Sequence, residues 1–206
     1  MNRFVSLSAA RRALVAAGSV VAVIAVTGCA HPISISPKAD AAAQAPSVAK
    51  IDKSVAYVIT PADMALEVTT PGGGGDKIKY QPYRDLDASL YASFSTVFKD
   101  VTKAASVDEA KGLSAKGVQL VIVPTIATTS SSESAFTWPP TKFSVTLTCT
   151  ATNPQGQQIA QVSATGHGAA EFDEFKSDFP LAARRASRAA LDNLTKALAA
   201  NEALRR

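Results

Sequence analysis

The feature that most constrains the fold of this chain is a strict alternation at residues 142–152. Phe143, Val145 and Leu147 start an apolar set, and the positions between them carry Ser or Thr. Because successive side chains of a strand point to opposite faces, this period of two predicts a strand with one apolar and one polar face. Turn residues at 153–156 and a second strand pattern at 157–165 predict an antiparallel hairpin.

Two longer segments have the period of amphipathic helices. One begins near Asp85 and continues to about Val101, and the other covers residues 180–200. In both, apolar residues recur at the spacings of three and four that place them on one side of a helix. Residues 106–109 have the spacing of a capping box, which predicts a short helix that ends at Gly117.

Nearly uninterrupted apolar residues at 55–59 and 118–125 predict two buried strands. With the hairpin and the helices, the order is strand, helix, short helix, strand, hairpin, helix. This order predicts an α/β fold of the α+β type. We expect a single mixed sheet with two main helices packed on one face as a two-layer sandwich, and a half-polar, Thr-rich face opposite.

The N-terminal end has the pattern of an export signal. Three arginines precede an apolar run of about 14 residues, at 13–26, which is shorter than the roughly 20 needed to cross a bilayer. Thr27, Gly28 and Cys29 follow. This segment resembles the lipobox of Gram-negative lipoproteins. The resemblance implies cleavage between Gly28 and Cys29, a diacylglyceryl thioether on Cys29 and acylation of the new amino terminus; an ordinary secretory signal peptide is the alternative.

Composition divides the chain into three parts. We expect a signal peptide at 1–28, the acylated cysteine with a flexible tether at 29–54, and one periplasmic domain at 55–206. Extended at about 3.1 Å per residue, some 20 tether residues reach roughly 60 Å, which would hold the domain clear of the bilayer. The alternation at 33–36 leaves open a short strand at the edge of the sheet.

Charge and cysteine content exclude some classes of protein. The formal net charge of the whole chain is +4, but from residue 29 onward 18 Lys and Arg face 17 Asp and Glu, so it falls to +1. A near-neutral surface lacks the clustered basic face of a nucleic-acid-binding protein. With Cys29 acylated, Cys149 has no second cysteine, and no internal disulfide is expected.

The second half of the chain is similar in layout to small α/β lipoproteins of the Gram-negative outer membrane. A short helix that ends at glycine leads into a Val/Ile-rich strand at 110–123, a polar turn follows at 152–157, and an Ala-rich helix lies at 182–198. Curli-secretion lipoproteins, lipoprotein activators of cell-wall synthases and several uncharacterised families share this layout. The resemblance implies a fold class and an envelope location, and carries no catalytic motif.

Three sites of possible chemistry have simpler explanations. Residues 72–77 are not a P-loop, because Ile78 stands where Ser or Thr should follow the lysine. Cys149 lies on an apolar strand face, where a small buried side chain is expected rather than a nucleophile paired with His167. His31 and His167 are too far apart in the predicted fold to share a metal. The sequence predicts no metal, no cofactor and no catalytic residue.

Two segments are candidates for contact with a partner. Four consecutive glycines predict a mobile loop, with aromatic and cationic residues next to it, and an exposed tryptophan in a proline turn can anchor a partner. The alternatives are that the glycine segment only connects two elements, and that the tryptophan packs over the edge of the sheet. The candidate residues are Gly74, Asp76, Tyr80, Tyr83, Arg84 and Trp138.

These features predict a non-enzymatic binding or assembly module anchored by lipid on Cys29. Lipoproteins retained in the inner membrane resemble one another in having Asp directly after the acylated cysteine. This chain has Ala30 at that position, so we expect it to be anchored in the outer membrane with its domain facing the periplasm. The expected partner is an envelope protein or peptidoglycan. Two alternatives remain: a carrier of small apolar molecules, and a periplasmic hydrolase of cell-wall or glycan substrates. The hydrolase would use the acids Glu171, Asp173, Glu174 and Asp178.

Overall fold

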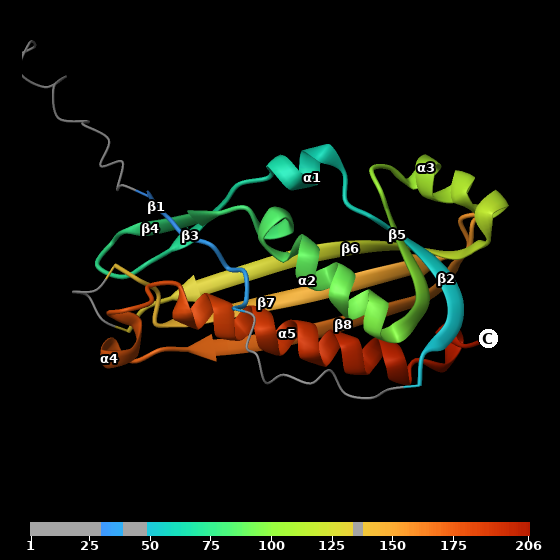
Figure 1. Ribbon diagram of the computed structural model, residues 1–206. Coiled ribbons are helices and arrows are strands. Elements are labelled where there is room, and N and C mark those ends of the chain that lie inside the picture. Colours follow the sequence, from blue (N-terminus) through green and yellow to red (C-terminus); the bar gives the residue numbers. More distant parts are fainter. Residues whose placement is uncertain (1–29, 39–48, 134–137) are drawn as a thin grey trace, which may run out of the picture.

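The computed structural model describes residues 30–38, 49–133 and 138–206. The predicted signal peptide, its cleavage site and the lipidation of Cys29 lie outside the described residues. The described strands are β1 (Ala30–Pro32), β2 (Ile51–Val58), β3 (Val68–Pro71), β4 (Lys77–Tyr80), β5 (Phe98–Ala104), β6 (Val118–Ser131), β7 (Lys142–Thr152) and β8 (Gln158–Ala169). The described helices are α1 (Pro61–Ala65), α2 (Pro82–Val97), α3 (Val107–Gly112), α4 (Phe172–Phe175) and α5 (Leu181–Ala200), with short 3-10 turns at Leu113–Lys116 and Glu202–Leu204 (Figure 1).

The strands form two mixed sheets. The larger has the order β5-β2-β6-β7-β8, in which β5, β2 and β6 are parallel and β6, β7 and β8 are antiparallel. The smaller has the order β1-β4-β3, with β1 parallel and β3 antiparallel to β4. The hairpin predicted from the alternation at 142–152 is present as β7 and β8.

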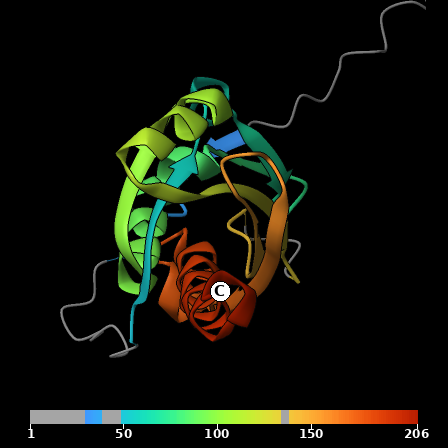
Figure 2. The same ribbon diagram turned by 90° about the vertical axis from the view of Figure 1, so that its right-hand side faces the viewer.

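The larger sheet carries helices on both faces. Helices α2 and α5 lie on one face, and the sheet curves around α5 (Figure 2). On the other face α3 packs at one end, over a separate apolar cluster formed by Ala56, Val58, Ala104, Ala110, Val118 and Val121. The outer face of β7 and β8 has no such cover among the described helices (Figures 1 and 2).

The predicted fold class is therefore wrong in two respects. There are two sheets instead of a single one, and five described helices, with α3 on the opposite face, instead of two in a two-layer sandwich. The strands of the small sheet are only three or four residues long, too short to show a period in sequence. Helix α2 ends at Val97, and Phe98 to Ala104 pairs with β2, although Phe98 and Val101 also fit the helical stripe.

Small residues allow α5 to lie directly on β8. A Cβ atom on Gly168 would lie 2.0 Å from the backbone oxygen of Ala182, and one on Gly166 would lie 2.2 Å from that of Ala186. Real Cβ atoms do not approach backbone this closely, so only glycine fits at either position. Strand β8 continues through both glycines to Ala169, four residues beyond its predicted end.

The expected flexible tether is wrong for its described residues. Strand β1, Ala30–Pro32, pairs with β4. The short strand left open from the sequence at 33–36 therefore lies a few residues earlier, at 30–32. Ile35 is fully buried, and its backbone N–H donates to the Asp85 carboxylate at 2.9 Å. The tether was predicted from the average composition of the 26 residues at 29–54. That average gives little weight to Ile35 and Ile51, whose side chains are buried in the core.

Within residues 30–38, 49–133 and 138–206, no helix combines the length and the apolar character needed to span a membrane. The 20-residue α5 is amphipathic and faces the sheet with its alanines and leucines. Its outward side carries charged residues such as Arg185 and Lys196. This helix is therefore part of the folded domain.

Candidate functional site

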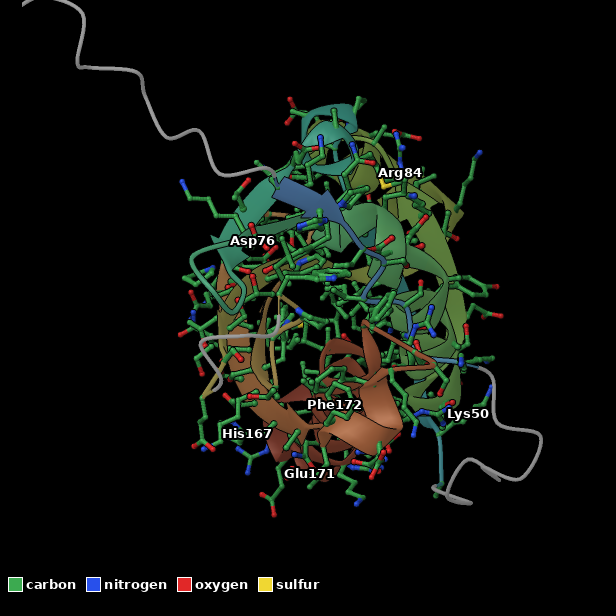
Figure 3. The ribbon with its side chains drawn as sticks, turned by 90° about the vertical axis from the view of Figure 1, so that its left-hand side faces the viewer. Lys50, Asp76, Arg84, His167, Glu171 and Phe172 are labelled. Carbon is green, nitrogen blue, oxygen red and sulfur yellow. The ribbon has the colours of Figure 1, made fainter. Side chains whose placement is uncertain are left out.

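The structure separates the six candidate contact residues into three groups. Gly74 and Asp76 lie in the turn between β3 and β4, next to Trp138. Tyr80 and Tyr83 are buried, with exposed fractions of 3% and 7%. Arg84 is exposed in the first turn of α2, apart from Asp76 (Figure 3).

The glycine run is a tight turn that packs against Trp138. Gly74 and Gly75 have φ angles of 65° and 85°, in the left-handed region that glycine adopts without strain. The backbone N–H of Gly73 donates to the Trp138 carbonyl oxygen at 2.9 Å, and a Cβ on Gly72 would lie 2.3 Å from that same oxygen. The glycines permit this close approach, and the mobility predicted for this loop from the sequence stays a prediction.

Trp138 lies in the middle of a stack of rings that crosses one end of the molecule. Its ring centroid is 4.3 Å from that of His31 in β1 and 4.9 Å from that of Phe179. His31 Nε2 lies 3.5 Å from the Asp76 carboxylate. Phe172 of α4 faces the same side of the molecule as Asp76 (Figure 3). We call this surface the aromatic end; its residues are His31, Asp76, Trp138, Phe172 and Phe179.

Tyr80 and Tyr83 attach the small sheet and α2 to β6. Tyr80 Oη lies 2.6 Å from Thr128 Oγ1 in a hydrogen bond, and Tyr83 Oη accepts from the backbone N–H of Ile126. Burial raises the pKa of both phenols above their ordinary value. Both side chains are therefore structural, and their partners lie more than 40 residues away in the sequence, where no local pattern reveals them.

A shallow groove of about 730 Å³ lies at the ends of β6, β7 and β8. The sequence did not predict this groove, because the residues that line it come together only through the pairing register of three strands. A smaller hollow of about 330 Å³ shares Lys142 and Ala169 with it and continues to Phe172 and Phe175. The residues that line the larger groove are Thr129, Ser130, Ser131, Lys142, Phe143, Ser144, His167, Gly168 and Ala169.

Beyond the groove, the outer face of the same three strands carries mostly uncharged polar residues, with Val123 and Ala127 of β6 among them. Cross-strand pairs link the hydroxyls: Thr146 Oγ1 lies 2.9 Å from Thr165 Oγ1, and Thr148 Oγ1 lies 3.0 Å from Ser163 Oγ. We call this surface the hydroxyl face. It consists of Thr125, Thr129, Ser144, Thr146, Thr148, Thr150, Gln161, Ser163 and Thr165, which the strand register places on one side of the sheet.

Cys149 and His167 point to opposite faces of the sheet. Cys149 is opposite Val162 on the inner face and only 1% exposed, whereas His167 is opposite Ser144 on the outer face. Burial raises the pKa of the Cys149 thiol to about 12. A thiol held neutral in an apolar layer is a poor nucleophile.

Three of the four acids considered for a hydrolase, Asp173, Glu174 and Asp178, pair with basic side chains. Asp173 pairs with Lys176 at 2.7 Å, and Asp178 pairs with Lys38 and Arg184 at 2.6 and 2.7 Å. A hydrogen bond from Arg185 lowers the pKa of Glu174 to about 2. A general acid needs a raised pKa at neutral pH, so this arrangement does not favour the hydrolase hypothesis.

Comparisons with known proteins were made by sequence family, by curated sequence and by solved structure. No family model matches the chain, and no curated protein matches it. Among solved structures, the chain is similar to that of a Xanthomonas campestris protein of the DUF330 family. The two share 11% sequence identity with a TM-score of 0.44, over 84% of this chain and 93% of that one.

Proposed function

We propose that this chain is a lipid-anchored protein of the bacterial envelope whose domain binds another envelope protein through the hydroxyl face. The observation that carries this proposal is the composition of that face. Nine uncharged polar residues lie on one side of three adjacent strands, and none of the described helices covers them. The anchor is the acylated Cys29 expected from the sequence, in the outer membrane and facing the periplasm.

Hydroxyl groups suit such a contact because each can both donate and accept a hydrogen bond. Covering them with a partner removes no charge from water, which avoids the high cost of burying ions. Elsewhere on the surface, exposed lysines and acids stand in pairs such as Lys99 with Asp52 and Lys103 with Asp87. The hydroxyl face is thus a part of the described surface that a partner can cover at low cost.

The shape of this face favours a protein partner over a small ligand. Small molecules bind in enclosed, mostly apolar pockets, whereas protein contacts spread over about 800 Å² of open surface on each partner. The groove beside His167 is shallow, open and continuous with the strand face. Peptidoglycan remains the alternative partner, and the experiment below distinguishes the two.

The test is cross-linking and affinity capture of the full-length, acylated protein from intact envelopes. One variant adds two positive charges to the hydroxyl face, Thr125→Lys with Ser163→Lys. The matched control adds the same charges at two exposed helix positions, Ala88→Lys with Ala200→Lys. Circular dichroism checks that both variants are folded.

We expect a specific envelope protein to be captured by the wild type and the control and to be lost from the hydroxyl-face variant. Capture of the same proteins by all three would contradict the proposed surface. Recovery of muropeptides in place of a protein, lost with the same variant, would overturn the protein partner and favour peptidoglycan.

A further inference from the structure

Almost no free chain separates the proposed lipid anchor on Cys29 from the folded domain. Residue 30 already belongs to β1, where Ala30 is opposite Lys77 and Ile33 N–H donates to the Lys79 carbonyl oxygen at 2.9 Å. Consecutive Cα atoms are about 3.8 Å apart, so lipid on residue 29 is attached one residue from the folded domain. A free tether of some 20 residues would instead reach roughly 60 Å.

Several independent contacts hold this segment on the domain. Ile35 is buried in the core and donates its N–H to the Asp85 carboxylate. The Ser36 hydroxyl donates to the Asp85 carbonyl oxygen, and Lys38 Nζ lies 2.6 Å from the Asp178 carboxylate. The partners of these contacts lie in β4, in α2 and in the segment before α5. Releasing β1 from the domain would therefore break contacts with three separate elements.

The surface around this attachment point is aromatic. Phe172 is 62% exposed and Phe179 is 45% exposed, and Phe179 packs against Trp138. Tryptophan and other aromatic side chains are enriched where a protein meets the boundary between lipid headgroups and acyl chains. Exposed phenylalanines at the anchored end would otherwise lie in water.

The charges near these rings largely cancel. Lys142 pairs with Glu133, Lys176 with Asp173, and Arg185 with Glu174. A contact between this end and lipid therefore depends on apolar area more than on attraction to anionic headgroups. We expect it to be insensitive to salt.

From these observations we infer that the aromatic end rests on the membrane surface, with Phe172, Phe179 and Trp138 in the headgroup layer. This inference rests on the proposed lipid anchor at Cys29. It fixes the orientation of the domain, because the end opposite α4, where α3 lies, then points away from the bilayer (Figure 1). The hydroxyl face is left accessible at the side.

The test uses the emission of Trp138, the single tryptophan of the chain. The full-length acylated protein is reconstituted into phosphatidylethanolamine-phosphatidylglycerol vesicles whose acyl chains carry bromine near the headgroup. Bromine quenches tryptophan only at short range. We expect Trp138 emission to fall in brominated vesicles relative to plain ones, equally at low and high salt.

The variants separate aromatic contact from anchoring. Phe172→Ser with Phe179→Ser should reduce the quenching, because the anchor keeps this end near the bilayer but the rings no longer draw Trp138 into the headgroup layer. The control Val107→Ser removes an exposed apolar side chain from α3 at the other end of the molecule and should quench like the wild type. Each variant is compared with itself in plain vesicles, which corrects for changes in intrinsic emission.

The mass of the amino-terminal peptide, measured on the same sample, distinguishes the two ways to fail. An acylated protein with unquenched Trp138, or with quenching unchanged in the phenylalanine variant, would overturn this orientation and leave the anchor in place. A protein without acyl chains on Cys29 would overturn the anchor itself, and with it the inference.

Discussion

The two faces of the β7–β8 hairpin have opposite chemical characters, one apolar and one polar. On the inner face, Leu147 and Cys149 are buried against α5, and Gly166 and Gly168 touch the backbone of that helix. On the outer face, most alternate residues of the same strands carry hydroxyls, and two cross-strand pairs of them are hydrogen-bonded. One hairpin therefore supplies both the core and the proposed binding surface. Substitutions at alternate positions should separate stability from binding.

The largest expected effect is at the contact between β8 and α5. Gly168→Val places side-chain atoms where the backbone of Ala182 and Ala186 lies, so we expect a loss of about 3 kcal/mol or more in the free energy of unfolding. Gln161→Val, on the outer face of the same strand, should change it by less than about 0.5 kcal/mol. Urea unfolding followed by circular dichroism measures both, and equal midpoints would mean that α5 does not pack this closely.

The next effect is the removal of a core side chain from β7. Leu147 is fully buried, and Leu147→Ala should cost about 2–5 kcal/mol of unfolding free energy. Its neighbour Thr146 faces outward, and Thr146→Ala should cost less than about 1 kcal/mol, since only an exposed cross-strand pair is lost. If both substitutions shifted the urea midpoint equally, the assigned faces of the strand would be wrong.

A chemical probe sharpens the same comparison. Because burial raises the pKa of Cys149 to about 12, its thiol should not react with a thiol reagent at pH 8 until urea unfolds the protein. In the acylated protein, one of the two cysteines in the chain should then react. Rapid labelling in the native state would place Cys149 at the surface, and two reactive thiols in urea would mean that Cys29 carries no lipid.

The smallest effect concerns the ion pair between Glu174 and Arg185. The folded pKa of Glu174, about 2, is below its ordinary value of 4.5, chiefly because Arg185 donates to it. The pair therefore stabilises fully above pH 4.5, and the contribution is lost as the pH falls toward 2. Both side chains are partly exposed, so the gain is small. The difference in urea midpoint between wild type and Glu174→Gln should shrink from pH 7 to pH 3; a constant difference would contradict this.

Periodicity predicted the parts of the molecule in which one long element faces the core. The alternation at 142–152 predicted β7 and its Thr-rich face, and the apolar stripes predicted α2 and α5, because side-chain direction follows from local backbone geometry. The small sheet could not be predicted, since three-residue β1 becomes a strand only through its pairing with β4. Val101 fits a helical stripe and a strand equally well, and pairing with β2 decides between them.

The candidate site was predicted in part. The glycine run and Trp138 do meet, although the sequence placed them on separate loops. Tyr80 and Tyr83 are buried because Thr128 and the Ile126 backbone, both on β6, bond their hydroxyls. His31 was assigned to a tether, and nothing local indicates that it stacks on Trp138. Phe172 and Phe179 lie in an acidic stretch, where phenylalanines are candidates for exposed apolar contacts. Neither was considered as a candidate from the sequence.

The claim on which the location, orientation and partner all depend is the lipid on Cys29. Its most direct test is the mass of the amino-terminal peptide of the protein extracted from envelopes. We predict a peptide that begins at Cys29 and carries a diacylglyceryl group on sulfur and an acyl chain on the amino group. A peptide with a free Cys29 thiol, or a mature chain that begins elsewhere, would contradict the account.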